Sequence, residues 1–171
     1  YDTVTGKKIP LEQRIGLLDR KLRVVNENTS KVEDWLFWTE RAFQSIYGYE
    51  YQGDNLLLAR ENLLYTFIDF YQAQFGYMPD IQWLCKIARI ISWNIWQMDG
   101  LKYVIPNSCI PICHENITFF GIEVTEELCP GCAKEDIRLH TGTYCKIQDW
   151  RFKTSRTFIS MMKGGNSRER L

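Results

Sequence analysis

Apolar side chains recur every three or four positions through most of the first hundred residues, which is the pattern of amphipathic helices. The expected helices cover residues 10–25, 31–43, 55–75 and 80–91. Ser30 and Glu33 form a capping-box pattern before the second helix. Asp54 can cap the third helix and Gly76 can end it.

Two short apolar segments interrupt this pattern and are expected to be buried strands, at residues 45–50 and 94–100. An acid closes each strand, Glu50 in the first and Asp99 in the second. Strands that alternate with helices favour an α/β fold, in which ligands bind at the carboxyl ends of strands. Glu50 and Asp99 are therefore candidate ligand-binding residues. They can equally be loop acids that cap the segments after them.

The character of the chain changes after Lys102. Five of the six cysteines lie beyond this point, together with several prolines and glycines and three short β-like runs at residues 117–124, 143–150 and 156–161. The sequence thus predicts three parts. They are a helix-rich α/β core at residues 1–102, a cysteine-rich β module at 103–162 and a flexible tail at 163–171.

The cysteines are clustered, which points to metal binding more than to a disulfide framework. Cys129 and Cys132 flank a Pro-Gly pair that lets the backbone turn tightly, so both thiolates can meet one ion. His140 and Cys145 follow, and the four side chains make a closed tetrahedral set suited to structural zinc. Cys85 stands apart in a helical pattern and is expected to be buried as a small apolar side chain.

Other ligand sets are open. Cys109, Cys113 and His114 can replace His140 or Cys145, or form a second, incomplete site. The cysteines can also be free thiols that lie near one another without a metal.

The chain carries 21 basic and 21 acidic residues, and this zero balance excludes a protein that coats polyanions through excess positive charge. The stretch from Lys146 to Arg170 is locally basic, and it is either a DNA-phosphate contact or a solvated surface. No apolar run is long enough to span a membrane, and no signal peptide is visible. We therefore expect a cytoplasmic protein.

Several segments resemble adenine-specific (N6) DNA methyltransferases of restriction-modification systems. Residues 45–50 followed by 54–63 are similar to the second conserved segment of these enzymes, and residues 90–101 to the third. Residues 129–150 resemble a cysteine-rich stretch that precedes the catalytic motif in some members. The similarity covers about residues 35–155, the middle of the catalytic domain.

The resemblance implies a partial Rossmann-like core that binds S-adenosylmethionine. It implies that Glu50 holds the ribose hydroxyls of this cofactor, that Tyr51 packs beside its adenine, and that Asp99 accepts from the adenine N6. DNA is the implied partner of the complete enzyme.

The chain also departs from this family. It has neither the glycine-rich loop that approaches the methionine part of the cofactor nor the catalytic Asn-Pro-Pro-Tyr motif, which holds a flipped adenine. We therefore assign no catalytic residue and expect a fragment or derivative that is inactive alone, unless another chain supplies the missing motifs. The alternative is a non-catalytic, zinc-stabilised protein-interaction module.

Overall fold

The computed structural model describes residues 4–119 and 121–162. Two compact units are formed, and each is described by itself. Unit 1 takes the described residues up to Gly48 together with Leu57–Ile95, and unit 2 takes Tyr49–Leu56 and the described residues from Trp96 onward. The expected flexible tail at residues 163–171 lies outside the described residues.

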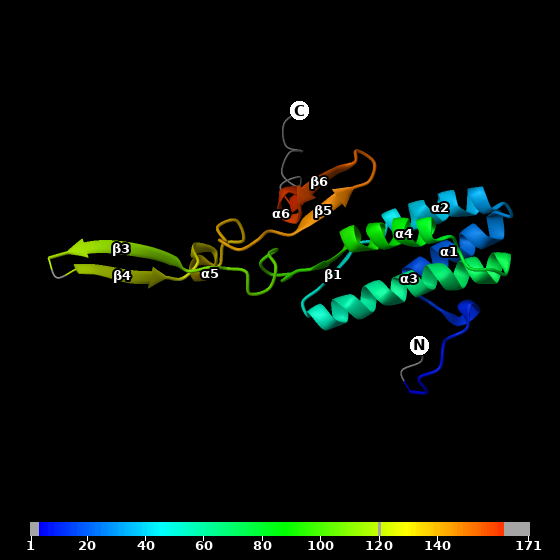
Figure 1. Cartoon of the computed structure of the whole chain (residues 1–171), viewed down its shortest axis with the longest axis horizontal. Helices are drawn as coiled ribbons and strands as arrows, with labels where there is room; N and C mark the ends of the chain where they lie inside the picture. The colour runs from blue at the N-terminus through cyan, green and yellow to red at the C-terminus, as the bar shows by residue number, and fades with distance from the viewer. Residues whose placement is uncertain (1–3, 120, 163–171) are drawn as a thin grey trace, which may run out of the picture. The chain divides into compact units, whose positions relative to one another are not determined.

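Unit 1 is helical, and its four long helices correspond to the four that the apolar periodicity predicts. Figure 1 shows them side by side in blue to green. The first expected helix is shorter than predicted, because residues 11–13 form only a single 3-10 turn and Arg14 is extended. The helices are α1 (Leu17–Asn28), α2 (Val32–Gln44), α3 (Gly53–Phe75) and α4 (Ile81–Asn94).

The helix ends follow local chemistry only in part. The Asp80 carboxylate caps α4 by accepting from the backbone N–H of Gln82 at 2.8 Å. Gly76 follows α3 with a φ of +80°, a conformation that favours glycine. The predicted capping box before α2 is wrong, because Lys31 is the N-cap and its side chain makes no capping bond. Asp54 lies inside the first turn of α3 rather than at its cap.

The core of unit 1 is built around Trp35 on α2. Its ring is fully buried and lies 5.4–5.9 Å from the rings of Phe67, Tyr71 and Phe75 on α3. The indole Nε1 donates to Asn26 Oδ1 at 2.6 Å, so its polar atom is also satisfied. The core is completed by apolar residues from the other helices, among them Leu18, Leu22, Phe43, Phe70, Ile87, Ile90 and Ile91.

The buried side chain of Asn94 fixes the end of α4. Its Nδ2 donates to the carbonyls of Phe43 and Ile46 at 3.0 and 2.9 Å, which ties α4 to the segment that follows α2. Cys85, also on α4, is exposed, so the expectation of a buried thiol is wrong.

The two predicted short strands exist but are shorter than expected. They are β1 (Gly48–Glu50) and β2 (Ile95–Gln97), and they pair with each other. The backbone N–H of Met98 donates to the carbonyl of Glu50 at 2.9 Å just beyond them. All three sheets of the described chain have two strands, so the structure is mixed α and β and the expected Rossmann-like sheet is not confirmed.

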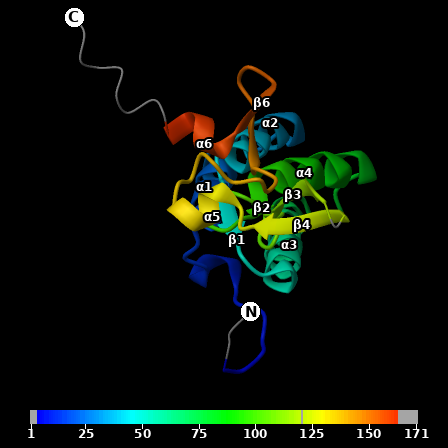
Figure 2. The same ribbon diagram turned by 90° about the vertical axis from the view of Figure 1, so that its left-hand side faces the viewer.

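Unit 2 contains two antiparallel hairpins and short helical turns. Both views show α6 beside β6 (Figures 1 and 2). The predicted β run at residues 156–161 is only partly right, because the strand ends at Thr157 and a helical turn follows. The elements are β3 (Ile112–Thr118), β4 (Gly121–Glu127), α5 (Pro130–Lys134), β5 (Lys146–Asp149), β6 (Thr154–Thr157) and α6 (Phe158–Met161).

Unit 2 begins earlier than the expected boundary after Lys102. Within the expected module, Val104 bridges Tyr144 and the N–H of Cys145 donates to the carbonyl of Tyr103 at 3.1 Å. The Cys145 thiol also donates to the carbonyl of Gln97 at 3.3 Å. Residues just after β2 therefore pack with the cysteine-rich part.

Among the described helices, none combines the length and the apolar character that a membrane span requires. The 23-residue helix α3 has the length, but it carries charged side chains along its course, among them Asp54, Arg60, Glu61 and Asp69.

Candidate metal centre

Four side chains of unit 2 converge on one point, namely those of Cys109, Cys129, Cys132 and His140. Their three sulfurs and one ring nitrogen all lie within 4.8 Å of one another. The Nδ1 atom of His140 is 3.5 Å from the sulfur of Cys109 and 3.7 Å from the sulfurs of both Cys129 and Cys132. One nitrogen therefore faces three sulfurs at nearly equal distances.

Hydrogen bonding alone does not account for this arrangement. A ring nitrogen carries at most one hydrogen, so it can donate to one sulfur and not to three. A tetrahedral zinc ion, with Zn–S bonds of about 2.3 Å and a Zn–N bond of about 2.05 Å, places sulfur and nitrogen about 3.6 Å apart. The observed separations of 3.5–3.7 Å agree with that value. The four residues thus fit a closed zinc site.

The Cys129–Cys132 pair is set by the short helix α5. Cys129 is its N-cap and Pro130 occupies the first turn, where a missing N–H costs nothing. The N–H of Cys132 donates to the Cys129 carbonyl at 2.8 Å, which brings the two sulfurs to the same side. The left-handed conformation of Glu135 ends the helix and turns the chain back toward His140.

Two glycines allow the other ligands to approach. A Cβ on Gly131 would lie 2.6 Å from both the backbone nitrogen and Nδ1 of His140. A Cβ on Gly142 would lie 2.5 Å from Ser108 Oγ and 3.1 Å from the Cys109 sulfur. Both positions need glycine, because a side chain there would displace a ligand.

Hydrogen bonds around the cluster hold the ligands in place. The backbone N–H of Thr141 donates to the Cys129 sulfur at 3.2 Å, and Lys102 Nζ donates to the Cys132 sulfur at 3.7 Å. The hydroxyl of Tyr144 accepts from the backbone N–H of His140 at 3.0 Å. Such outer contacts orient metal ligands and tune their basicity.

The charges of the site are also suited to a cation. Burial raises the pKa of the Cys129 thiol, but hydrogen bonds led by those from Thr141 outweigh it and bring the pKa to about 5. Burial and the neighbouring sulfurs raise the pKa of Cys109 to about 11, a shift that a bound divalent cation reverses. Three thiolates around zinc carry one net negative charge, which the ammonium group of Lys102 offsets.

Cys145 is not part of this group, although the sequence placed it in the ligand set. Its sulfur is buried against the Gln97 carbonyl, and burial raises its pKa to about 11. Cys109, one of the competing ligands, takes the fourth position. Of the other competitors, Cys113 and His114 are exposed on β3, where His114 Nε2 lies 3.6 Å from a carboxylate oxygen of Glu127.

The two strand-end acids have structural roles. Glu50 Oε1 accepts from the backbone N–H groups of Tyr51 and Gln52 at 2.9 and 3.1 Å. Asp99 Oδ1 accepts from Leu101 and Lys102 in the same way, at 2.9 and 3.2 Å. Both acids therefore cap the segments that follow them, which is the alternative that the sequence left open. The side chain of Tyr51 is exposed.

Comparisons with known proteins gave no relative. No protein-family model matches the chain, and no match was found among curated proteins or among solved structures. Function is therefore inferred from the residues of this chain and their geometry.

Proposed function

We propose that Cys109, Cys129, Cys132 and His140 hold a structural zinc ion and that the chain is a zinc-stabilised binding protein. The observation that carries this proposal is the convergence of three sulfurs on one imidazole nitrogen at 3.5–3.7 Å. Four protein ligands complete the tetrahedron and leave no position for a water molecule or a substrate. The ion therefore stabilises structure and does not take part in hydrolysis.

The ion joins three segments of unit 2 that otherwise share little apolar core. Cys109 comes from the loop before β3, Cys129 caps α5 and Cys132 lies within it, and His140 follows that helix. From Val104 to Met162, Val104, Cys129 and Cys145 are the buried apolar side chains of the described chain. A module with so small a core needs a cross-link to fold stably.

Alkylation of the native chain tests the ligand set. In zinc-loaded protein the exposed thiols of Cys85 and Cys113 are expected to react quickly with iodoacetamide, whereas Cys109, Cys129 and Cys132 are protected by the metal. A chelator should expose these three thiols. Peptide mass spectrometry after alkylation measures each cysteine separately.

Cys145 is the internal control for this experiment, because it is protected by burial rather than by a metal. It should become reactive only when unit 2 unfolds, either in denaturant or after complete removal of zinc, and it should stay protected in the zinc-loaded chain. Equal reactivity of Cys109 with and without zinc would exclude it as a ligand.

We propose a second candidate function, because β1 and β2 pair, Glu50 ends β1, and Asp99 follows β2 by two residues. The methyltransferase resemblance implies that an acid after one strand holds the ribose and an acid after a second strand contacts the adenine. The pairing of β1 and β2 brings the segments that carry these two acids together. On this proposal the chain is derived from an adenine-specific DNA methyltransferase, binds S-adenosylmethionine through Glu50, Tyr51 and Asp99, and needs another chain for catalysis.

Local positive charge supports DNA as the partner in this second case. All four basic side chains of the β5–β6 segment are exposed, namely those of Lys146, Arg151, Lys153 and Arg156. The remaining cations of the basic stretch, Lys163, Arg168 and Arg170, lie outside the described residues. Exposed cations of this kind bind phosphates without reading sequence.

Calorimetric titration with S-adenosylmethionine tests the second candidate. Saturable binding is expected to be lost in Glu50→Ala, since the carboxylate would hold the ribose hydroxyls, and to be kept in Glu33→Ala, which changes an exposed acid on α2. Absence of binding by the folded, zinc-loaded wild-type chain would reject the cofactor site and leave the zinc proposal untouched.

A further inference from the structure

A cavity of about 310 Å³ lies within unit 1, between residues 8–19 and one face of α3. The α3 wall consists of Asn62, Tyr65, Thr66 and Asp69, whose spacing places them along a single helical stripe. The opposite wall is formed by residues of the 8–19 segment. Its volume is at the lower end of the range found for small-molecule sites.

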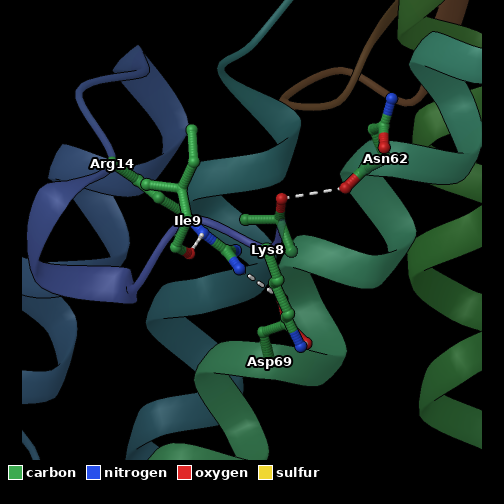
Figure 3. Close-up of polar contacts among 6 residues, drawn as sticks. Lys8, Ile9, Arg14, Asn62 and Asp69 are labelled. Carbon is green, nitrogen blue, oxygen red and sulfur yellow. Dashed lines mark hydrogen bonds and ion pairs between the residues drawn. The ribbon is translucent and has the colours of Figure 1, made fainter. Parts of the chain in front are cut away.

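An ion-pair cluster that joins the two walls of this cavity carries a surplus of positive charge. The Asp69 carboxylate pairs with Lys8 Nζ at 2.5 Å and with the Arg14 guanidinium at 2.7 Å, and Figure 3 shows both basic side chains reaching toward Asp69. Asp69 and Arg14 are largely buried, with 9% and 14% of their side chains exposed. Two cations share one carboxylate, so this trio has one net positive charge and N–H donors to spare.

The same cavity is lined by an acid without a counter-charge. Asp19 lies in the first turn of α1, and its Oδ1 is buried and accepts no hydrogen bond from the described residues. The helix dipole favours a negative charge at this position, but it supplies no hydrogen to Oδ1. The Asp19 side chain lines the cavity, so its carboxylate offers a ligand there a negative charge that no described Lys or Arg pairs with.

We propose that this cavity binds a free α-amino acid with an apolar side chain. The ammonium group donates to Asp19, and the carboxylate group lies against the surplus positive charge of Lys8 and Arg14. Ile15 and Tyr65, which are 79% and 50% exposed, line the cavity and supply apolar surface for the side chain of the ligand.

The charge pattern selects this chemistry over simpler ligands. A plain anion would be repelled by Asp19, and a plain cation would be repelled by Lys8 and Arg14. A zwitterion carries one charge that suits Asp19 and one that suits Lys8 and Arg14. The site consists of unit 1 residues, and neither a zinc ligand nor Glu50 takes part in it.

The test is a calorimetric titration of the full, zinc-loaded chain with L-phenylalanine and L-leucine as probes. Saturable binding is expected, and Asp19→Asn should weaken it by about tenfold or more, because a charge-assisted hydrogen bond is lost at constant side-chain size. Asp34→Asn is the matched control, an exposed acid on α2 that does not line the cavity. It should leave binding unchanged.

A ligand without the amine tests the same contact without any substitution. Phenylpropionate, which has no ammonium group, should bind the wild-type chain at least about tenfold more weakly than L-phenylalanine does. The proposal is overturned if neither amino acid binds the wild type, if phenylpropionate binds as well as L-phenylalanine, or if folded Asp19→Asn binds with unchanged affinity. Loss of zinc binding would not affect these outcomes.

Discussion

Removal of zinc is expected to unfold the cysteine-rich part of unit 2 while the helices of unit 1 stay folded. Structural zinc contributes about 10–16 kcal/mol to small modules of this kind, which matches or exceeds the whole stability of a typical domain. The described residues from Val104 onward bury few apolar side chains that could compensate. Hydrogen-exchange mass spectrometry with and without a chelator measures the effect peptide by peptide.

The helices of unit 1 are the internal control in this measurement. Amides of α2 and α4 should exchange at the same rate with and without the metal, because their core contains none of the four zinc ligands. Unchanged protection of α5 and of the Val104–Tyr144 pairing after complete zinc removal would refute the structural role of the ion.

Replacement of Trp35 by alanine is expected to destabilise unit 1 by about 3–5 kcal/mol. The fully buried indole contacts Phe67, Tyr71 and Phe75, and its loss leaves a cavity in the centre of the aromatic cluster. The substitution also leaves Asn26 Oδ1 without its donor. Urea unfolding monitored by circular dichroism at 222 nm, the helical band, gives the change in unfolding free energy.

Trp38 on the same helix is the matched control. Its side chain is 55% exposed and its ring contacts that of Phe37 at 5.2 Å. Trp38→Ala should therefore cost less than about 1 kcal/mol, the value of a single surface aromatic pair. Equal costs for the two tryptophans would contradict the described core.

The helices were predictable from sequence because their apolar residues recur at helical spacing. The same residues form the faces through which the helices pack together. The details at their ends were not. The Ser30–Glu33 pattern satisfies a capping box, but the helix begins one residue too late to use it. Cys85 falls at helical spacing with apolar residues, yet its position on α4 faces solvent. Periodicity gives an approximate face and not the burial of each residue.

The metal site was predictable where its ligands are close in sequence. Cys129 and Cys132 share one short helix, and His140 returns through a tight turn. The choice between Cys109 and Cys145 depends instead on long-range pairing, in which the N–H of Ile105 donates to the Thr143 carbonyl and that of Thr143 to Ser108 Oγ. The spacing of cysteines along the chain does not show which of these two cysteines the long-range pairing brings to the metal site.

The acids at the strand ends illustrate the same limit. Sequence alone allowed Glu50 and Asp99 to be either ligand contacts or loop caps, and each is now seen to accept two backbone N–H groups through one oxygen. Capping uses one carboxylate oxygen of each acid. A ligand can therefore still bind the second oxygen of the same carboxylate.

The most direct test of the account is the zinc content of two purified variants, measured by inductively coupled plasma mass spectrometry. Cys109→Ser is predicted to lose stoichiometric zinc, because a serine hydroxyl is a poor substitute for a thiolate in a closed site. Cys145→Ser is predicted to keep one zinc ion per chain, since its sulfur lies against the Gln97 carbonyl and outside the cluster. The reverse result, with zinc kept in Cys109→Ser and lost in Cys145→Ser, would contradict the site described for this protein.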